Sequence, residues 1–442
     1  MTFRLCVEAL IGTLVNGAST QGAQFDSQYR LEEKEKRKDR VVGAAPMEIE
    51  AEYSKLTWPM RAVMSSISYW PGREQEEKDL GKRSSWSRLL HKCHRGVVNA
   101  SMLVLTLGGS SEIVHLGRSA DINDLIECCL IVSTAYLALL RVLVFATHAT
   151  SMSRIVETMR NDWTDNYRDE ADKALLRDRC LWYYKLASFY ICSVIFAFAS
   201  FTISPYMEIM LRKDDGPMFL PFRGYYFFNL SSVSRTEFNG IYLLNSMAGF
   251  FACGTIAGAS SFSLIAAVHG SAKFAIVQKH FESVEWTSRQ QVKRCVRHHQ
   301  DCIKFADDVE DSINILVLGQ FVMSTCLLCL AGFQFTTMLR DRGRCMKYLS
   351  FLQAATTNLF LYSIAAQALQ TESLEVAEAI FRSKWIGSCS SYEIRMIIMR
   401  SRKACKITAG KFYELSLESF LKVLSSSFSY FTVLFTAKYD GV

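Results

Sequence analysis

Residues 414–439, ELSLESFLKVLSSSFSYFTVLFTAKY, carry the pattern from which the fold can be read. On an α-helix, each residue turns by about 100°, so this segment shows two distinct faces. It is also longer than the roughly 20 residues that a helix needs to cross a bilayer. One stripe is polar or small along its whole length and comprises Glu418, Lys422, Ser425, Ser429, Thr432 and Thr436, with Val433 at its edge. Another face is apolar and comprises Leu417, Leu421, Leu424, Phe428, Phe431 and Phe435.

The polar stripe restricts what can surround this helix inside a membrane. Lipid cannot satisfy polar side chains, so the stripe must face protein or water. A helix that lines a pore has this pattern. A close helix–helix seam, in which small residues let two backbones approach, has it too. The residues alone leave both interpretations open.

Six further apolar stretches are long enough to span a membrane. Half the residues are apolar, 12% are aromatic and only six are proline, as in helical membrane proteins with polar loops. No strand-like alternation and no internal repeat competes with this interpretation. We therefore predict an all-α membrane protein with seven transmembrane helices. The spans are expected near residues 97–116, 125–147, 186–207, 241–268, 313–339, 348–370 and 415–437.

The distribution of Lys and Arg predicts the orientation of these spans. The loops after spans two, four and six hold 22 of them, and residues 1–96 hold 16 more. The remaining loops and the C-terminal tail hold 10. Because basic loops stay in the cytosol, we expect a cytosolic N-terminus and an extracellular C-terminus, opposite to G-protein-coupled receptors. A basic inner surface that meets membrane lipid also explains the net charge of +7 without nucleic acid.

The chain is expected to have three parts. Residues 1–46 combine a broken apolar run with polar and charged stretches. This pattern predicts a disordered or non-native extension. A secretory signal would need an unbroken apolar core. Residues 47–96, with Trp58 and Trp70, are expected to form a cytosolic arm on the inner membrane surface. Residues 97–442 are expected to form the seven-span domain.

The cysteines and histidines do not predict a disulfide framework or a metal site. Most of the fourteen cysteines lie in predicted spans or on the cytosolic side. Cys295, His298 or His299, and Cys302 share one helical face, but ligands from one helix cannot surround zinc tetrahedrally. No cofactor motif or catalytic set is present, so no enzyme is expected. Asn229 begins a glycosylation sequon in a loop predicted to be extracellular.

Two ionisable residues, Glu127 and Arg141, lie within the second predicted span. Ionisable groups at membrane depth usually face protein or water and mark functional sites. Glu127 lies near the outer end and Arg141 near the inner end, so both could instead extend to the membrane surface. Between residues 286 and 316, a charged helix is expected to continue the fifth span into the cytosol.

Three stretches together carry a resemblance to a known family. Residues 429–434 read SYFTVL, residues 373–385 read SLEVAEAIFRSKW, and residues 295–310 read CVRHHQDCIKFADDVE. The first resembles the terminal S-Y-F-T-x-L motif of the insect odorant receptors. The second resembles the stretch after their sixth span, and the third resembles the helix before their fifth span. The likeness in layout extends over residues 47–442.

This resemblance implies an odorant receptor that acts as a ligand-gated cation channel subunit in the plasma membrane of an olfactory dendrite. Four subunits would surround a pore lined by the seventh helix, and cytosolic helical extensions would form an anchor region between them. Val433 would be the hydrophobic constriction, with Ser429, Thr436 and Ala437 as neighbouring lining. The implied partner is an odorant co-receptor, with no obligatory G protein. This chain lacks the co-receptor's enlarged loop after span four and would be the ligand-tuning subunit.

The resemblance also implies a pocket for a small volatile molecule in the outer half of the membrane, among spans two, three, four and six. Such a ligand needs an enclosed, mostly apolar cavity. Taken singly, Phe198 and Phe201 are better explained as packing residues than as ligand contacts. By depth, the implied pocket residues are Ile131, Ala135, Phe198, Phe201, Tyr242, Ser246, Phe250, Phe351 and Ala355.

Two other classes share some of these features. Gustatory receptors have the same architecture, but their terminal T-Y-x-x-x-x-x-Q pattern matches residues 429–436 less well. A secondary transporter would show paired repeats with broken helices in both halves, and the seven spans lack that correspondence. Ionic current on ligand addition, without a coupling gradient, would distinguish a channel from a transporter.

Overall fold

A computed structural model describes residues 46–73, 85–117, 122–166, 169–211, 219–225, 233–339, 341–387 and 391–440. The chain divides into two compact units, Met1–Tyr53 and Ser54–Val442, and the arrangement below is that of the second unit. The expected extension 1–46 lies outside the described residues except for Pro46, and so does the sequon at Asn229.

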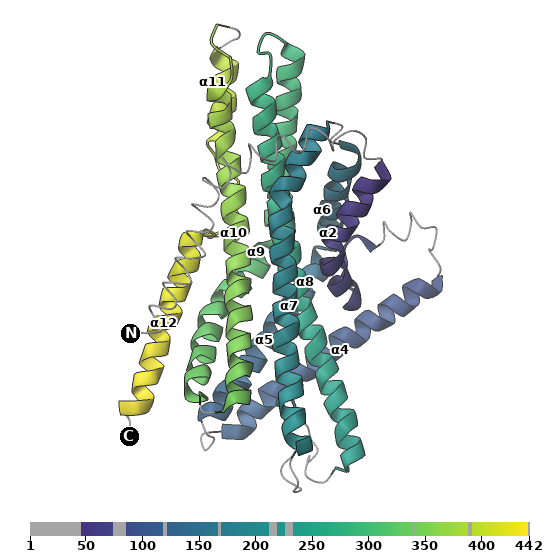
Figure 1. Cartoon of the computed structure of the whole chain (residues 1–442), viewed down its shortest axis with the longest axis vertical. Coiled ribbons are helices and arrows are strands. Elements are labelled where there is room, and N and C mark those ends of the chain that lie inside the picture. The colour runs from purple at the N-terminus through teal and green to yellow at the C-terminus, as the bar shows by residue number, and fades with distance from the viewer. Residues whose placement is uncertain are drawn as a thin grey trace, which may run out of the picture. The chain divides into compact units, whose positions relative to one another are not determined.

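The described chain is almost entirely helical, which confirms the all-α prediction. Helices α7, α8 and α10 run side by side in Figure 1, and both α7 and α10 pack along α8. A π-helical turn, η2 (Asp162–Asn166), follows α6. The helices are α2 (Pro46–Ser66), α4 (Ser85–Leu116), α5 (Ile122–Thr147), α6 (Ala149–Asn161), α7 (Glu170–Leu211), α8 (Arg235–Ser283), α9 (Arg289–Thr337), α10 (Arg342–Arg382), α11 (Ser391–Ser401) and α12 (Leu417–Asp440).

Each of the seven predicted spans corresponds to one helix, although span 313–339 extends two residues past the end of α9 and span 415–437 begins two residues before α12. Among the described residues, α4, α5, α7, α8, α9 and α12 are long and apolar enough to cross a membrane. The sixth predicted span, 348–370, lies in the less apolar α10, which is 41 residues long. Because α10 packs against α7, α8, α9 and α12, much of its surface meets protein and need not be apolar. The helical membrane fold is confirmed, and the orientation stays a prediction.

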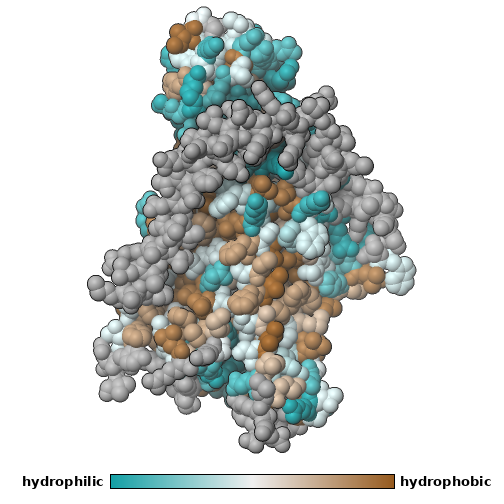
Figure 2. Space-filling view, in the orientation of Figure 1, coloured by the Kyte–Doolittle hydropathy of each residue, from teal (hydrophilic) through white to brown (hydrophobic). Residues whose placement is uncertain are grey.

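Helices α8 and α9 are much longer than a membrane is thick. Each has 49 residues, about 73 Å at 1.5 Å per residue, against a hydrocarbon core of about 30 Å. The helix expected between residues 286 and 316 is confirmed as the first half of α9. In Figure 2 hydrophobic side chains gather over the lower half of the view. Hydrophilic ones gather at the upper end, where α8, α9 and α11 project in Figure 1.

Arg141 of α5 lies at the centre of the helix contacts. Its fully buried guanidinium donates to the Ile256 carbonyl at 2.6 Å and to Ser260 Oγ at 3.0 Å, both on α8. It also donates to Gln320 Oε1 of α9 at 2.5 Å, which accepts from Asn358 Nδ2 of α10 at 2.9 Å. The expectation that Arg141 could extend to the membrane surface is therefore wrong. Neutral acceptors inside the bundle bind both terminal nitrogens of the guanidinium, and these contacts join four helices.

A short β-hairpin connects α11 to α12. Its strands, β1 (Thr408–Ala409) and β2 (Tyr413–Glu414), are antiparallel and have two residues each, too short for a visible alternation in the sequence. Gly410 and Lys411 turn the chain with φ of +60° and +70°. Lys411 also pairs with Glu310 and Asp311 of α9. The hairpin thus fixes the start of α12 to the charged part of α9.

Candidate functional site

α12 presents its polar stripe on the exposed side. Of the 18-residue apolar stretch that could cross a membrane, only 11% is buried within the chain in α12, compared with 89% in α8. The stripe residues are all exposed, and Val433 at their edge is 66% exposed. Ser429, Thr436 and Ala437, the other predicted pore residues, are exposed as well. Among the residues that the structure describes, none covers this side of the helix.

The other side of α12 packs on α9. Phe431 and Leu434 lie against a buried cluster that includes Leu327 and Phe333 of α9. Leu421, expected on the apolar face, is 40% exposed instead. It lies about 80° around the helix from Phe431, so it is at the border of the contact. Phe435, at the same border, is 36% exposed.

Four predicted pocket residues lie together around a further ring, Phe222. Its centroid is 6.4 Å from Phe198 and 6.3 Å from Phe201 of α7, with the rings nearly parallel. Phe250 of α8 lies 5.9 Å from Phe198, and Phe351 of α10 lies 6.0 Å from Phe201. These five rings, called the aromatic cluster below, have the chemistry of an apolar binding site.

Phe222 lies in the loop after α7, and two residues of α8 hold it. Asn245 Oδ1 accepts from the Phe222 N–H at 3.0 Å, and Asn245 Nδ2 donates to the Phe222 carbonyl at 3.1 Å. One turn later, Gly249 leaves room for the ring, since a Cβ there would lie 2.0 Å from Phe222 Cε2. Phe222 could not be predicted from the sequence. Its only local sign is a polar residue and a glycine one turn apart in an apolar span.

Other contacts hold the remaining predicted pocket residues. Tyr242 belongs to a second cluster with Leu220 and Phe238, and its hydroxyl donates to the Thr202 carbonyl at 2.6 Å. Ser246 Oγ donates to the Tyr242 carbonyl at 2.8 Å. The others are Ile131 and Ala135, buried on α5, and Ala355, half-buried on α10.

A charged network borders the aromatic cluster. Lys347 of α10 pairs with Glu127 of α5, and its Nζ lies 4.4 Å from the ring centroid of Phe201. Arg223, which follows Phe222 in the loop after α7, pairs with Asp124 at 2.7 Å and with Glu127 at 3.8 Å. The Glu127 side chain is only 13% exposed. It is therefore held by two cations of the protein rather than extended to the membrane surface.

A cleft of about 760 Å³ lies toward the other end of α8, which is predicted to be cytosolic. Lys273, in its wall, is 23 residues after Phe250, about 35 Å further along the helix. A small volatile molecule needs an enclosed, mostly apolar site, so this cleft does not fit the predicted ligand. The charged residues in its lining include Arg154, Asp172, Lys273, Asp301 and Lys304.

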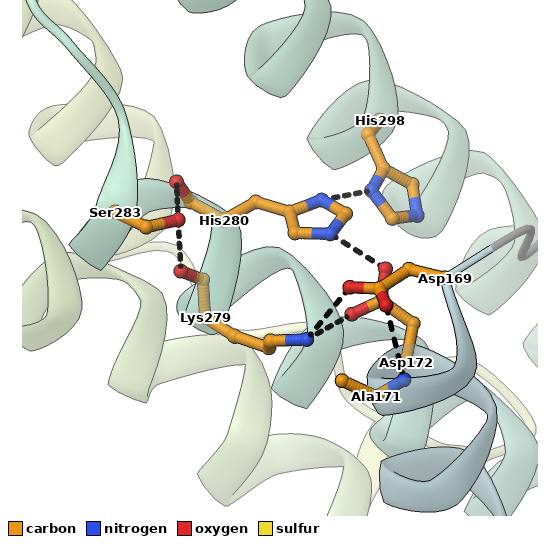
Figure 3. Close-up of polar contacts among 7 residues, drawn as sticks. All are labelled: Asp169, Ala171, Asp172, Lys279, His280, Ser283 and His298. Atoms are coloured by element: carbon orange, nitrogen blue, oxygen red, sulfur yellow. Dashed lines mark hydrogen bonds and ion pairs between the residues drawn. The ribbon is translucent and has the colours of Figure 1, made fainter. Parts of the chain in front are cut away.

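Figure 3 shows the polar contacts at one edge of this cleft. Asp172 of α7 accepts from Lys279 Nζ at 2.6 Å and from His280 Nε2 at 2.8 Å, both near the end of α8. His280 Nδ1 faces His298 Nδ1 of α9 at 3.4 Å. Burial and the neighbouring His280 lower the pKa of His298 to about 4, so His298 is neutral at physiological pH.

The single-helix set of possible metal ligands is not arranged as a metal site. Cys295 and Cys302 are buried on α9, and the His299 ring packs edge-on against Phe274 and Phe281. Among the described residues, no three His, Cys, Asp or Glu side chains are grouped to hold an ion. The twelve cysteines in this part of the chain are free thiols.

The family model described as 7tm odorant receptor matches residues 121–428. That range covers more than half of the chain, from α5 to the first half of α12. The chain belongs to the insect odorant receptor family. The resemblance stated above is thereby confirmed, and it favours this family over the gustatory receptors and transporters. This odorant receptor is a multi-pass membrane protein.

Individual relatives agree with this placement. The receptor is 31% identical to odorant receptor 13a of Drosophila melanogaster over 173 residues, which cover 36% of this chain and 41% of that protein. It is 29% identical to odorant receptor 67c of the same species over 143 residues, which cover 32% and 35%. The matched stretches thus span about two fifths or less of these relatives. The olfactory receptor OR5 of Machilis hrabei, solved in complex with eugenol, has the same fold, with a TM-score of 0.75. It is 14% identical, and the match covers 89% of this chain and 99% of that one.

Proposed function

We propose that this odorant receptor is the ligand-tuning subunit of a cation channel that opens when a small volatile molecule binds among its transmembrane helices. Its partner is an odorant co-receptor, and four subunits surround one pore. The channel acts in the plasma membrane of an olfactory dendrite and requires neither a G protein nor nucleic acid.

α12 supplies the observation that carries this proposal. The helix is long and apolar enough to cross a membrane, yet it is 11% buried and exposes a continuous polar stripe. Because lipid cannot satisfy that stripe, other subunits or pore water must cover it. The hydroxyls of Ser429 and Thr432 donate to carbonyls of their own helix at 3.0 and 2.7 Å. Their oxygen lone pairs therefore remain available to water or cations.

In this proposal Val433 forms the closed gate. Four valine side chains around one axis would make a narrow apolar ring that excludes water by dewetting. Ser429, Thr436 and Ala437 would line the pore beside it, since all three share the exposed side of α12. A small rotation that replaces Val433 by these neighbours would admit hydrated cations.

The volatile ligand is proposed to bind at the aromatic cluster. Rings from α7, α8, α10 and the loop meet there, so a bound molecule would contact several helices at once. Phe222 would close the site from the loop side, and the Lys347–Glu127 pair would supply a polar wall. The surrounding wall would include Ile131, Ala135, Tyr242, Ser246 and Ala355.

The tuning role rests on the connection between α8 and α9. Only residues 284–288 join the two helices, where the co-receptor is expected to have an enlarged loop. The extended ends of α8, α9 and α10, together with α11, are available to form the anchor region with neighbouring subunits. Co-expression with a co-receptor, followed by a screen of volatile molecules, tests the proposal. A ligand-evoked cation current is expected, and binding without any current would contradict it.

We expect Val433→Ala to raise the resting current at least about twofold while the order of odorant potencies stays unchanged, because a smaller side chain widens the apolar ring. Whole-cell recording of basal current, ion selectivity and dose responses measures both effects. Val423→Ala makes the same chemical change at a half-buried position of α12 and serves as the control. If Val433→Ala and Val423→Ala behave alike, the exposed side of α12 is a packing seam.

The orientation can be tested separately. An epitope placed before Met47 is expected to stain only in permeabilised cells, because 22 Lys and Arg on the even-numbered loops favour a cytosolic N-terminus. Asn229→Gln is expected to remove any glycan, which a mobility shift on a gel would show. Staining of the epitope on intact cells would reverse the predicted orientation.

A further inference from the structure

Two histidines from different helices face each other at the edge of the charged cleft (Figure 3). Nδ1 of His280 on α8 and Nδ1 of His298 on α9 are 3.4 Å apart, and the ring centroids are 5.4 Å apart. Hydrogen bonds from N–H donors usually measure about 2.7–3.2 Å. Two nitrogens at about 2.0–2.1 Å from a tetrahedral Zn²⁺ would lie about 3.3–3.4 Å apart. The separation therefore fits an ion between the nitrogens better than a shared proton.

Asp172 of α7 determines which nitrogen of His280 is available. Its carboxylate accepts from His280 Nε2 at 2.8 Å, which places the proton there and leaves Nδ1 as the acceptor that faces His298. A carboxylate behind a metal-binding imidazole is common in metal sites, because it fixes the tautomer and the ring orientation. Lys279 holds the other oxygen of Asp172 at 2.6 Å, and the Asp172 side chain is 6% exposed. Asp172 and Lys279 therefore hold the His280 ring in this orientation before an ion binds.

The pair has an open approach. The His280 side chain is 34% exposed, and both histidines line the cleft of about 760 Å³. An ion and its water ligands can therefore enter from the cleft. Because the described residues contain no third side-chain ligand in reach, water would complete the coordination. The aspartates of the same lining, Asp162, Asp172, Asp301 and Asp308, offset most of the positive charge of its five Lys and Arg residues.

We propose that His280 and His298 form a two-histidine site for a divalent ion of the zinc class, which ties the end of α8 to α9. Imidazole ligands suit zinc, whereas Mg²⁺ and Ca²⁺ prefer oxygen ligands. The two histidines are 18 residues apart and meet because residues 284–288 turn α8 back along α9. A search along one helix face could not find them as a pair.

Zinc titration of the purified full-length receptor tests this site. We expect saturable binding of one Zn²⁺ per chain by calorimetry, and at least about tenfold weaker binding by His280→Ala or His298→Ala. Asp172→Asn keeps both ligands and is expected to weaken binding by about 10–100-fold. His148→Ala removes a histidine outside the cleft and should bind like wild type. Mg²⁺ should not compete.

Thermal unfolding separates loss of the site from loss of the fold. Zn²⁺ should raise the apparent melting temperature of wild type and of His148→Ala, because a ligand that binds only the folded state stabilises it. Zn²⁺ should not raise the melting temperature of His298→Gln. His298→Cys supplies a thiolate ligand, so Zn²⁺ should again raise its melting temperature. No binding by wild type, or equal binding by the His280→Ala/His298→Ala double variant, would overturn the proposal. Neither assay needs a current, so the outcome is independent of the proposed channel function.

Discussion

Arg141→Ala is expected to lower the free energy of unfolding by about 2–5 kcal/mol, because it leaves a large cavity among four helices. It also removes the donor to Ser260 and Gln320, two polar groups inside the bundle. Since folded proteins are stable by only about 5–15 kcal/mol, most of the receptor should fail to reach the cell surface. Surface labelling, and the melting temperature of detergent-purified receptor, measure this loss.

Two further substitutions show what Arg141 contributes. Arg141→Met fills most of the volume without a buried charge, so it should recover part of the lost stability. Arg154→Ala removes an exposed arginine whose ion pair with Asp308 is 3.5 Å long, and it should change stability by about 1 kcal/mol or less. If Arg141→Ala melts at the same temperature as Arg154→Ala, the buried hydrogen bonds do not hold the helices together.

Gly249→Ala is expected to reduce odorant potency about tenfold or more, because its Cβ would meet three Phe222 ring atoms at 2.0–2.8 Å. Overpacking of this kind usually costs about 1–3 kcal/mol, and about 1.4 kcal/mol is tenfold in affinity. The ring would have to leave its place between Phe198 and Phe201. Dose–response curves with the co-receptor present measure the shift.

Gly240→Ala is the matched control on the same helix. A Cβ at Gly240 would meet nothing within 4 Å, so this change should leave potency unaltered. In the Phe222→Ala background the clash is gone, and Gly249→Ala should then have little additional effect. Additive effects in the double variant would show that the loop ring and the glycine act independently.

The helices could largely be predicted from the sequence because the signals for them are local. Apolar runs of sufficient length mark the spans, and the small and polar residues of 425–436 mark the exposed side of α12. The charged run after residue 286 contains no proline or glycine, which indicates a continuous helix. It forms the first half of α9, and the fifth span forms the second half. The sixth predicted span lies in α10, which carries polar residues where other helices enclose it.

The candidate sites could be predicted only in part because their key contacts are distant in sequence. Phe222 depends on Asn245, 23 residues later, and Arg141 depends on Ile256, 115 residues later. The structure brings rings from α7, α8 and α10 near one another, and depth along the spans does not reveal the ring that the loop supplies. The burial of Arg141 could not be predicted, because position within a span does not show which neighbours accept hydrogen bonds.

The exposed stripe of α12 has a consequence for how this receptor is made in the cell. A newly inserted chain without neighbours would hold Ser425, Ser429 and Thr432 against lipid, where polar groups are costly. Assembly removes that cost, so we expect unassembled chains to be retained and degraded by membrane quality control. The number of these receptors at the surface would then follow the supply of the partner subunit rather than the rate at which this chain is synthesised.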